Sequence, residues 1–299
     1  MTLRFAIDPV PPFRLDLTVW TLRRRPINAV DVWDGKTYRR GLVFGDRPVE
    51  IAVTQTGSTL EVTLTGARLG SSMTSAVTMV LQRMLGLHVD LTAFYDFAAQ
   101  DPKLDRLVHR FRGAKPPRFP SVFEALVNGI SCQQLSLTVG ITLLNRLAEH
   151  CGLVAGSSLY CFPRPDDVVK MTPAELRRLG YSGNKSRALL ELSRAIVDGR
   201  LDLEALVEYD DQEIKRRLLE MRGIGRWTAE YTLLRGMGRT NLFPGDDVGA
   251  RNNLERWLKL STPLDYAGVA HVLKKRKRYG GLLYFHLLLD RLDEAGYLR

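Results

Sequence analysis

The spacing of the hydrophobic residues changes once along this 299-residue chain, and that change limits the fold more than any other feature. Apolar and polar residues alternate over 13–19, 49–53 and 60–64, which predicts strands with one buried face. Asp34-Gly35, between two such runs, is a typical hairpin turn. Because short turns join the runs, we expect this part of the chain to form an antiparallel sheet.

Beyond Gly70 the apolar residues recur at every third or fourth position, the spacing of helices with one buried face. The Pro-rich, basic stretch 113–120 interrupts this pattern, and we interpret it as a linker between domains. After it, helices are predicted near residues 121–130, 133–151, 173–180, 184–198, 211–221, 226–236, 247–259 and 279–294. The expected fold class is α+β, with an N-terminal antiparallel sheet domain and its helices over residues 1–114 and an all-α domain over residues 115–299.

The charge of the chain narrows the class of partner. Lys and Arg number 43 against 33 Asp and Glu, a net charge of +10, which favours a polyanion such as nucleic acid or an anionic membrane surface. No stretch approaches the ~18 apolar residues of a membrane span, and the cations are not gathered on one amphipathic helix, so we expect no membrane partner. No signal peptide is apparent, and the three cysteines and five histidines lack metal-ligand spacing. We therefore expect a cytoplasmic protein without a structural metal.

The tripeptide Gly223-Ile224-Gly225 joins two predicted helices. Glycines permit positive φ and close approach to another molecule, and the Ile between them can anchor the turn between the two helices. The amides that then open the second helix form a ready site for a phosphate, with Arg222 and Arg226 on either side. A plain turn between helices with a glycine cap explains the same residues, so this motif alone leaves both interpretations open.

Two aromatic residues and two acids follow the tripeptide. Trp227 and Tyr231 lie four positions apart and share one face of a helix, where they could sandwich a planar ring or simply fill the core. Asp246 and Asp247 open a later helix, and helix capping explains one of them. An ionised carboxylate is also what cleavage of a glycosidic bond requires, because the sugar becomes oxocarbenium-like in the transition state.

Taken together, these motifs resemble the helix–hairpin–helix DNA glycosylase superfamily. The tripeptide, Thr228-Ala229 and an acid about twenty residues later match its central motif. Residues 130–136 resemble its turn between two core helices, and residues 183–195 resemble the helix before its hairpin. The likeness covers about residues 115–295, and the N-terminal sheet fits both the bacterial 3-methyladenine DNA glycosylase II branch and the 8-oxoguanine glycosylases.

Position 227 separates those two branches. The bifunctional 8-oxoguanine enzymes carry a nucleophilic Lys there, whereas this chain has Trp227, and a Trp followed four residues later by a Tyr resembles the alkylation-repair branch. The resemblance implies a monofunctional glycosylase without a cofactor, which hydrolyses the N-glycosidic bond of alkylated purines (3-methyladenine, 7-methylguanine and also hypoxanthine) and so initiates base excision repair. An 8-oxoguanine-type glycosylase/lyase and a non-catalytic protein that binds damaged DNA remain the alternatives.

The resemblance also assigns roles to residues. Asp247 would be the catalytic carboxylate and Asp246 a capping or supporting residue, while Trp227, Tyr231 and Tyr279 would line the base pocket. The partner would be double-stranded DNA whose damaged base is flipped into that pocket, and one lesion requires only a monomer. The implied DNA-binding residues are Arg222, Gly223, Ile224, Gly225, Arg226, Thr228, Ser131, Cys132, Gln133, Gln134, Lys185, Lys277 and Arg278.

Three points remain open within this resemblance. The alkylation-repair branch places a bulky apolar wedge near Ser131, where this chain has Ser and Cys. Either Gln133 or Gln134 substitutes for it, or the adjacent helix lies differently. The run 274–278 supplies five positive charges, and we interpret it as a phosphate contact, although a solvated loop explains it too. The family's hairpin often holds a monovalent cation through main-chain carbonyls, which the sequence does not reveal.

Overall fold

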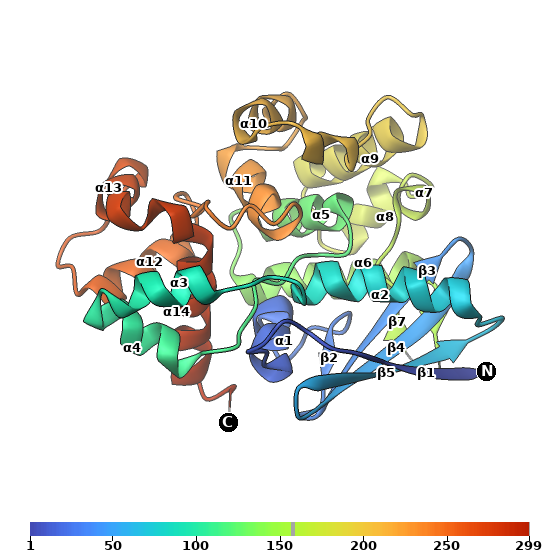
Figure 1. Ribbon diagram of the computed structural model, residues 1–299. Coiled ribbons are helices and arrows are strands. Elements are labelled where there is room, and N and C mark those ends of the chain that lie inside the picture. The colour runs from blue at the N-terminus through green and yellow to red at the C-terminus, as the bar shows by residue number, and fades with distance from the viewer. Residues whose placement is uncertain (157–158, 299) are drawn as a thin grey trace.

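The computed structural model describes residues 1–156 and 159–298, which form a five-stranded sheet, a two-stranded sheet of β6 and β7, and a larger set of helices (Figure 1). The strands are β1 (Thr2–Ile7), β2 (Val32–Trp33), β3 (Thr37–Phe44), β4 (Arg47–Thr56), β5 (Thr59–Gly66), β6 (Val154–Ala155) and β7 (Leu159–Tyr160). The helices of the first half are α1 (Leu15–Arg23), α2 (Ser71–Leu85), α3 (Thr92–Ala99), α4 (Pro102–Arg110), α5 (Val122–Cys132) and α6 (Leu137–Cys151). The later helices are α7 (Pro165–Val168), α8 (Pro173–Arg178), α9 (Gly183–Val197), η1 (Ala205–Glu208), α10 (Asp211–Leu219), α11 (Arg226–Arg235), α12 (Val248–Leu258), α13 (Tyr266–Val272), η2 (Lys274–Tyr279) and α14 (Gly280–Glu294).

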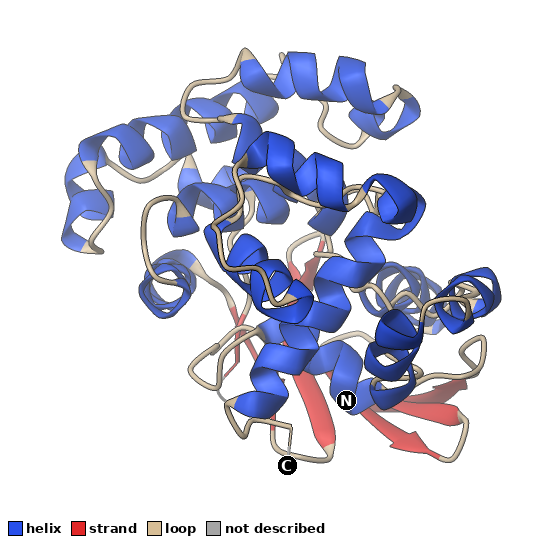
Figure 2. Cartoon of the chain, turned by 90° about the vertical axis from the view of Figure 1, so that its left-hand side faces the viewer, coloured by secondary structure: helices blue, strands red, loops and turns tan. Residues whose placement is uncertain are grey.

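The main sheet has five strands in the order β1-β5-β4-β3-β2, and every neighbouring pair is antiparallel. Ile51 pairs with Leu64 and Val53 with Val62, so the alternating apolar residues of both strands face one core. This confirms the antiparallel sheet that the alternation and turn signals predict. Figure 2 shows the strands gathered low in the molecule, with helices making up the rest.

The prediction of a strand over residues 13–19 is wrong, because this segment leads into helix α1. Every residue of α1 except Asp16 is buried, since the sheet core covers one side of the helix and α14 packs against another. A helix that is buried on nearly all sides has no clear division into an apolar and a polar face, and in α1 the apolar residues also alternate with Asp16 and Thr18. The alternation therefore could not distinguish a helix from a strand at this point.

The stretch 113–120 is not an exposed linker but a buried connection. Lys115 is almost fully buried and its ammonium donates to the carbonyl of Val89 at 2.6 Å. Phe119 packs into the sheet core, and its amide donates to the carbonyl of Arg235 at 2.7 Å. The prolines indicate correctly that no helix forms here, but they do not indicate whether this segment is buried or exposed to solvent.

The hydrophobic cores cross the expected domain boundary between residues 114 and 115. The sheet core takes Tyr231 from α11, and a second core packs α1, α3 and α4 against the helices α12–α14. Trp20 of α1 stacks on Tyr297, with ring centroids 5.5 Å apart. The boundary itself remains a prediction, but the two parts of the chain share their interiors.

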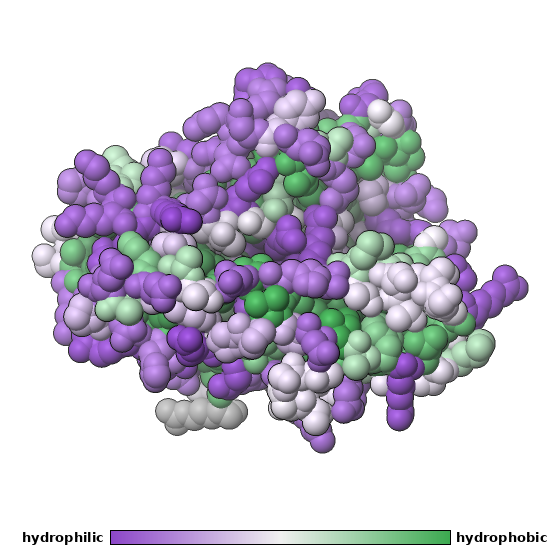
Figure 3. All heavy atoms as spheres, viewed as in Figure 1, coloured by the Kyte–Doolittle hydropathy of each residue, from purple (hydrophilic) through white to green (hydrophobic). Residues whose placement is uncertain are grey.

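Hydrophilic side chains cover most of the face seen in Figure 1, and hydrophobic ones show mainly lower down, toward α2 and the sheet (Figure 3). Among the described residues, no helix combines the length and the apolar composition that crossing a membrane would require.

Candidate active site

The two glycines of the hairpin between α10 and α11 differ in whether the backbone and the surrounding space require a glycine. Gly223 has φ +77°, and a Cβ there would lie 2.7 Å from the Cβ of Ala188. Gly225 has φ −96°, and a Cβ there would meet nothing within 4 Å. Ile224 is buried between them, as expected, and anchors the hairpin. Only Gly223 therefore uses the left-handed backbone conformation that the sequence suggests for both.

The arginines on either side of the hairpin are paired with acids. Arg222 Nε lies 2.9 Å from an oxygen of Glu191, and Arg226 Nε lies 2.5 Å from Oδ2 of Asp246. The guanidinium of Arg226 also lies 3.8 Å from the ring centroid of Tyr266. Both side chains are about half exposed, so they remain accessible, but each already has a carboxylate partner.

The turn between α5 and α6 is fastened to the hairpin. The amide nitrogen of the Gln133 side chain donates to the carbonyl of Gly223 at 2.7 Å and to the hydroxyl of Thr228 at 2.8 Å. Lys185 from α9 donates to the carbonyls of Ser131 and Gln133 at 2.9 and 2.8 Å. Lys185, Gln133 and Thr228, which the resemblance assigns to DNA, thus hold these segments together. The carbonyl of Gly223 is occupied by Gln133, so the suggested hairpin cation stays a prediction.

The residues of this turn differ in their exposure to solvent, and so in whether they can contact DNA. Ser131 is fully buried and its hydroxyl donates to the carbonyl of Val127, so a direct contact with DNA at this residue is wrong. Cys132 is partly buried and lies against a cavity. Gln134 is exposed at the tip with φ +53°, and Leu135, which the sequence analysis did not single out, is 42% exposed. Gln134 and Leu135 therefore form the outer edge of the turn.

A cavity of about 670 Å³ lies between this turn, α11, the start of α12, α14 and the residues that follow α1. Its volume is in the range of small-molecule sites. The rings of Trp227 and Tyr231 have centroids 5.4 Å apart and are tilted by 32°. The residues that line the cavity are Arg24, Arg25, Cys132, Gln133, Gln134, Leu135, Ser136, Leu137, Trp227, Tyr231, Asp246, Asp247, Val248, Gly249, Ala250, Asn252, Asn253, Arg256, Tyr284, Leu288 and Arg291.

Asp247 is fixed on the wall of this cavity by two hydrogen bonds. One carboxylate oxygen caps α12 by accepting from the amide of Ala250 at 2.8 Å, and the other accepts from the indole nitrogen of Trp227 at 3.2 Å. Asp246 makes the ion pair with Arg226 and is not the cap, so the division of roles expected for the two acids is partly wrong. Together these two bonds fix the orientation of the Asp247 carboxylate.

Tyr279 does not line the cavity, which corrects the sequence prediction. It belongs to η2, packs on Phe94 and Phe97 of α3, and donates its hydroxyl to the carbonyl of Ala93. The third aromatic ring of the cavity is Tyr284 on α14, whose burial raises the pKa of its hydroxyl well above the usual value. Tyr284 is therefore neutral at physiological pH, as its burial requires.

Arg24 is a further residue of the cavity, and none of the sequence motifs above includes it. It lies in the run Arg23-Arg24-Arg25 at the end of α1. This run of three cations before Pro26 is the feature of the sequence that could have indicated a functional residue here. Arg24 is buried, lines the cavity and donates to the hydroxyl of Tyr231 at 2.8 Å. No local pattern connects it to Tyr231, since the two are 207 positions apart.

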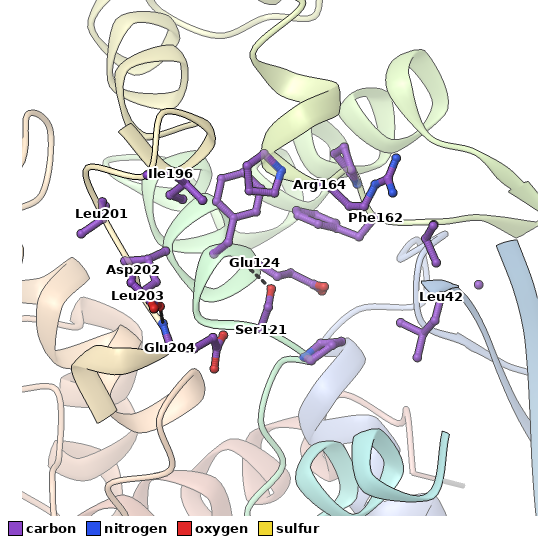
Figure 4. A pocket seen from close by; sticks show the side chains of 17 residues that line it. Leu42, Ser121, Glu124, Phe162, Arg164, Ile196, Leu201, Asp202, Leu203 and Glu204 are labelled. Carbon is purple, nitrogen blue, oxygen red and sulfur yellow. Dashed lines mark hydrogen bonds between the residues drawn. The ribbon is translucent and has the colours of Figure 1, made fainter. Parts of the chain in front are cut away.

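A second cavity, of about 590 Å³, lies between the sheet and the helices, and none of the described residues that the sequence analysis singled out lines it. Figure 4 shows Leu42 on one side of it, Leu203 and Glu204 on the other, and Ser121 and Glu124 between them. Its three acids are already engaged: Glu124 pairs with a buried arginine of β3, Glu204 pairs with an arginine of α2, and Asp202 accepts from two backbone amides that follow it. We therefore place the chemistry in the cavity of Asp247, which has convergent polar groups.

The described residues contain no group of three or more His, Cys, Asp and Glu side chains arranged to hold a metal ion. Lys277 and Arg278 are exposed on η2, apart from the cavity lining. Whether these two cations contact DNA remains a prediction.

Comparison with known proteins gives two family matches. The model described as HhH-GPD superfamily base excision DNA repair protein matches residues 127–278, and the AlkA N-terminal domain matches residues 4–121. A DNA-3-methyladenine glycosylase of Bacillus subtilis is 31% identical over 169 residues, 56% of each chain. The match thus spans only about half of that relative's length. DNA-3-methyladenine glycosylase 2 of Escherichia coli is 26% identical over 251 residues, 81% of this chain and 84% of that protein.

Among solved structures, the 3-methyladenine DNA-glycosylase from Archaeoglobus fulgidus superposes with a TM-score of 0.84. It is 27% identical and the match covers 97% of this chain and 99% of that one. The likeness therefore includes both the sheet and the helical part.

Proposed function

The chain belongs to the HhH-GPD superfamily of base excision DNA repair proteins, and on this premise we propose that it is a monofunctional DNA glycosylase that removes alkylated purines from DNA. The observation that carries the proposal is the position of Asp247, a carboxylate fixed beside the Trp227 and Tyr231 rings on the wall of one cavity. The names of the relatives in Bacillus subtilis and Escherichia coli support the same reaction.

The cavity suits a purine that has left the duplex. Trp227, Tyr231 and Tyr284 offer ring faces for a flat base, and an electron-poor ring stacks well on such faces. Asp247 would stabilise the positive charge that develops on the sugar and orient the attacking water. Its two hydrogen bonds hold the carboxylate in place before the substrate arrives, so little reorganisation is needed.

The lining favours hydrolysis over a covalent mechanism. A Schiff-base route needs an amine at the sugar, and no lysine is among the described residues that line the cavity. Water then replaces the base, which leaves an abasic site and a free base as products. This argues against the glycosylase/lyase alternative.

Double-stranded DNA would bind across the hairpin and the turn between α5 and α6. The exposed amides at the start of α11 would contact a phosphate, and Gln134 and Leu135 would occupy the space that the flipped base leaves. One cavity serves one lesion, so we propose that the protein acts as a monomer.

The test is release of bases from methylated duplex DNA, followed by mass spectrometry. We expect the wild type to release 3-methyladenine and 7-methylguanine, and Asp247→Asn to lower the rate by about 10²- to 10⁴-fold. Asn is a good helix cap, so α12 should persist and binding to a duplex with an abasic-site analogue should survive.

Asp246→Asn is the matched control, because it removes the adjacent carboxylate and an ion pair that is partly exposed. We expect this variant to keep its release activity. The proposal fails if the wild type releases neither base, or if the two variants lose activity equally.

A further inference from the structure

We propose that Arg24 determines which bases the cavity favours, by assisting the departure of neutral oxopurines and opposing the binding of cationic alkylpurines. This inference rests on the proposed glycosylase function. It assigns a specificity-determining role to a residue outside the helical part that carries the hairpin and Asp247.

Arg24 is placed firmly at the edge of the base site. It follows α1 with φ +60°, is 4% exposed, and lies among the residues that line the cavity. One guanidinium nitrogen donates to the Tyr231 hydroxyl at 2.8 Å and the other to the Asn128 side-chain oxygen at 2.7 Å. Because both partners are fixed in helices, the guanidinium cannot swing out to solvent.

The positive charge of Arg24 lacks a carboxylate partner. Its hydrogen-bond partners are neutral, and no acid of the described chain lies within ion-pair distance of it. Its Nε is also buried with no hydrogen-bond partner in the described structure. The Nε of Arg40, a buried arginine of β3, likewise has no partner, but Arg40 differs in its counter-ions, since Asp31 and Glu124 both pair with it at 2.6 Å. A buried charge without a counter-ion is costly. Arg235 also has none, but it donates to two backbone carbonyls away from the cavity, whereas Arg24 lines the cavity.

The two classes of lesion respond oppositely to such a charge. Alkylation at N3 or N7 makes the bound purine cationic, so a nearby guanidinium weakens its binding. A neutral oxopurine such as hypoxanthine is uncharged when bound, and when the C1′–N9 bond breaks, the electron pair stays on the base. The base then carries negative charge until it takes a proton, while the oxygen of water bonds to C1′ and water gives up its own proton. A cation beside the base stabilises this developing negative charge.

Arg24 also holds the Tyr231 ring in place through its hydrogen bond, and the experiment must distinguish this positioning effect from the effect of the charge. Loss of the hydrogen bond could shift the ring and impair all substrates alike. A purely positioning role thus lowers release of every base by a similar factor, whereas an electrostatic role changes the ratio between neutral and cationic bases.

The experiment measures single-turnover release from two duplexes, one with hypoxanthine and one with 7-methylguanine. For Arg24→Met, which removes the charge at similar length, we expect hypoxanthine release to fall about 10- to 100-fold, the size of a hydrogen bond to a charged group. Release of 7-methylguanine should stay the same or rise. Arg24→Lys keeps the charge, and Tyr231→Phe removes the hydrogen bond but leaves Arg24, so both should largely keep the wild-type ratio.

The outcomes separate the two proposals. If the wild type releases neither base, the proposed function fails and the inference falls with it. If the wild type is active but Arg24→Met lowers both rates equally, or changes neither, the electrostatic role of Arg24 is overturned. Thermal melting of each variant shows whether it is folded. If Arg24→Met does not fold, Arg24→Gln takes its place, because it also removes the charge but keeps a hydrogen-bond donor.

Discussion

At the scale of single residues, the two hairpin glycines allow packing and DNA contact to be separated. Gly223→Ala forces a side chain into φ +77° and within 2.7 Å of the Ala188 Cβ, so we expect it to lower the free energy of unfolding by about 1–3 kcal/mol. Gly225→Ala meets no atom within 4 Å and starts from φ −96°, so its cost should stay below about 1 kcal/mol. Its added methyl group nevertheless lies at the exposed helix start proposed to contact a phosphate.

Urea unfolding and binding to a duplex with an abasic-site analogue check both variants. We expect Gly225→Ala to bind DNA more weakly at nearly normal stability, while Gly223→Ala is mainly less stable. Unchanged binding by Gly225→Ala would contradict a close approach of DNA at this turn.

Part of the candidate site follows from sequence because its members are close along the chain. Trp227 and Tyr231 share a helix face, and capping logic brings Asp247 to a helix start, so local rules suffice for these three. The sequence predicts Tyr279 in the place that Tyr284 occupies. Five positions turn a helix by about 140°, so a small error in register moves the ring to another side. Arg24 depends on an interaction across the whole chain, which no local pattern predicts.

At the scale of elements, turns are predicted well from the local sequence, whereas the burial of a segment is predicted poorly. The hairpin of β2 and β3 follows from Asp34-Gly35, and most helices after residue 121 follow from their apolar spacing. The error at α1 and the buried stretch 113–120 have one cause: both are covered on several sides by elements distant in sequence. The burial of these two segments depends on the tertiary fold, and the local residue propensities carry no information about it.

The short helix η2 allows a test of the basic run as an element. Arg276 pairs with Asp101 and packs on Trp257, so it fixes the segment, whereas its four basic neighbours are exposed. We replace those four by Gln, leaving Arg276 in place: Lys274, Lys275, Lys277 and Arg278. If they bind phosphates, the slope of log binding constant against log salt should become shallower by about 0.9 for each phosphate that is no longer neutralised, with stability nearly unchanged.

Binding to undamaged duplex DNA at several salt concentrations measures this slope. A matched variant controls for net charge alone, with four exposed cations of the β2–β3 turn, α8, α9 and the turn before α8 replaced by Gln: Lys36, Lys170, Arg177 and Arg194. Equal slopes for the two variants would show that η2 acts only through the overall charge.

At the scale of the whole molecule, the sheet and the helical part are interdependent. Arg235 of α11 is fully buried, and its guanidinium donates to the carbonyls of Thr21 and Leu22 at the end of α1. The apolar face of α14 packs against α1 and α4, which precede the buried stretch 113–120. The part with Asp247 therefore takes its support from the part with the sheet, and Arg24 links the two at the cavity itself.

This interdependence predicts that residues 115–299 do not fold alone, although the family match to the helical part lies entirely within them. Without α1 and the sheet, Arg235 loses both carbonyl partners, and the apolar faces of α11 and α14 that pack on them become exposed to water, which costs several kcal/mol. That cost is comparable with the whole stability of a typical domain, about 5–15 kcal/mol. Calorimetry should give a single unfolding transition for the full chain. Near-ultraviolet circular dichroism should show no fixed aromatic packing in the fragment, and a cooperative melt of the fragment would contradict the prediction.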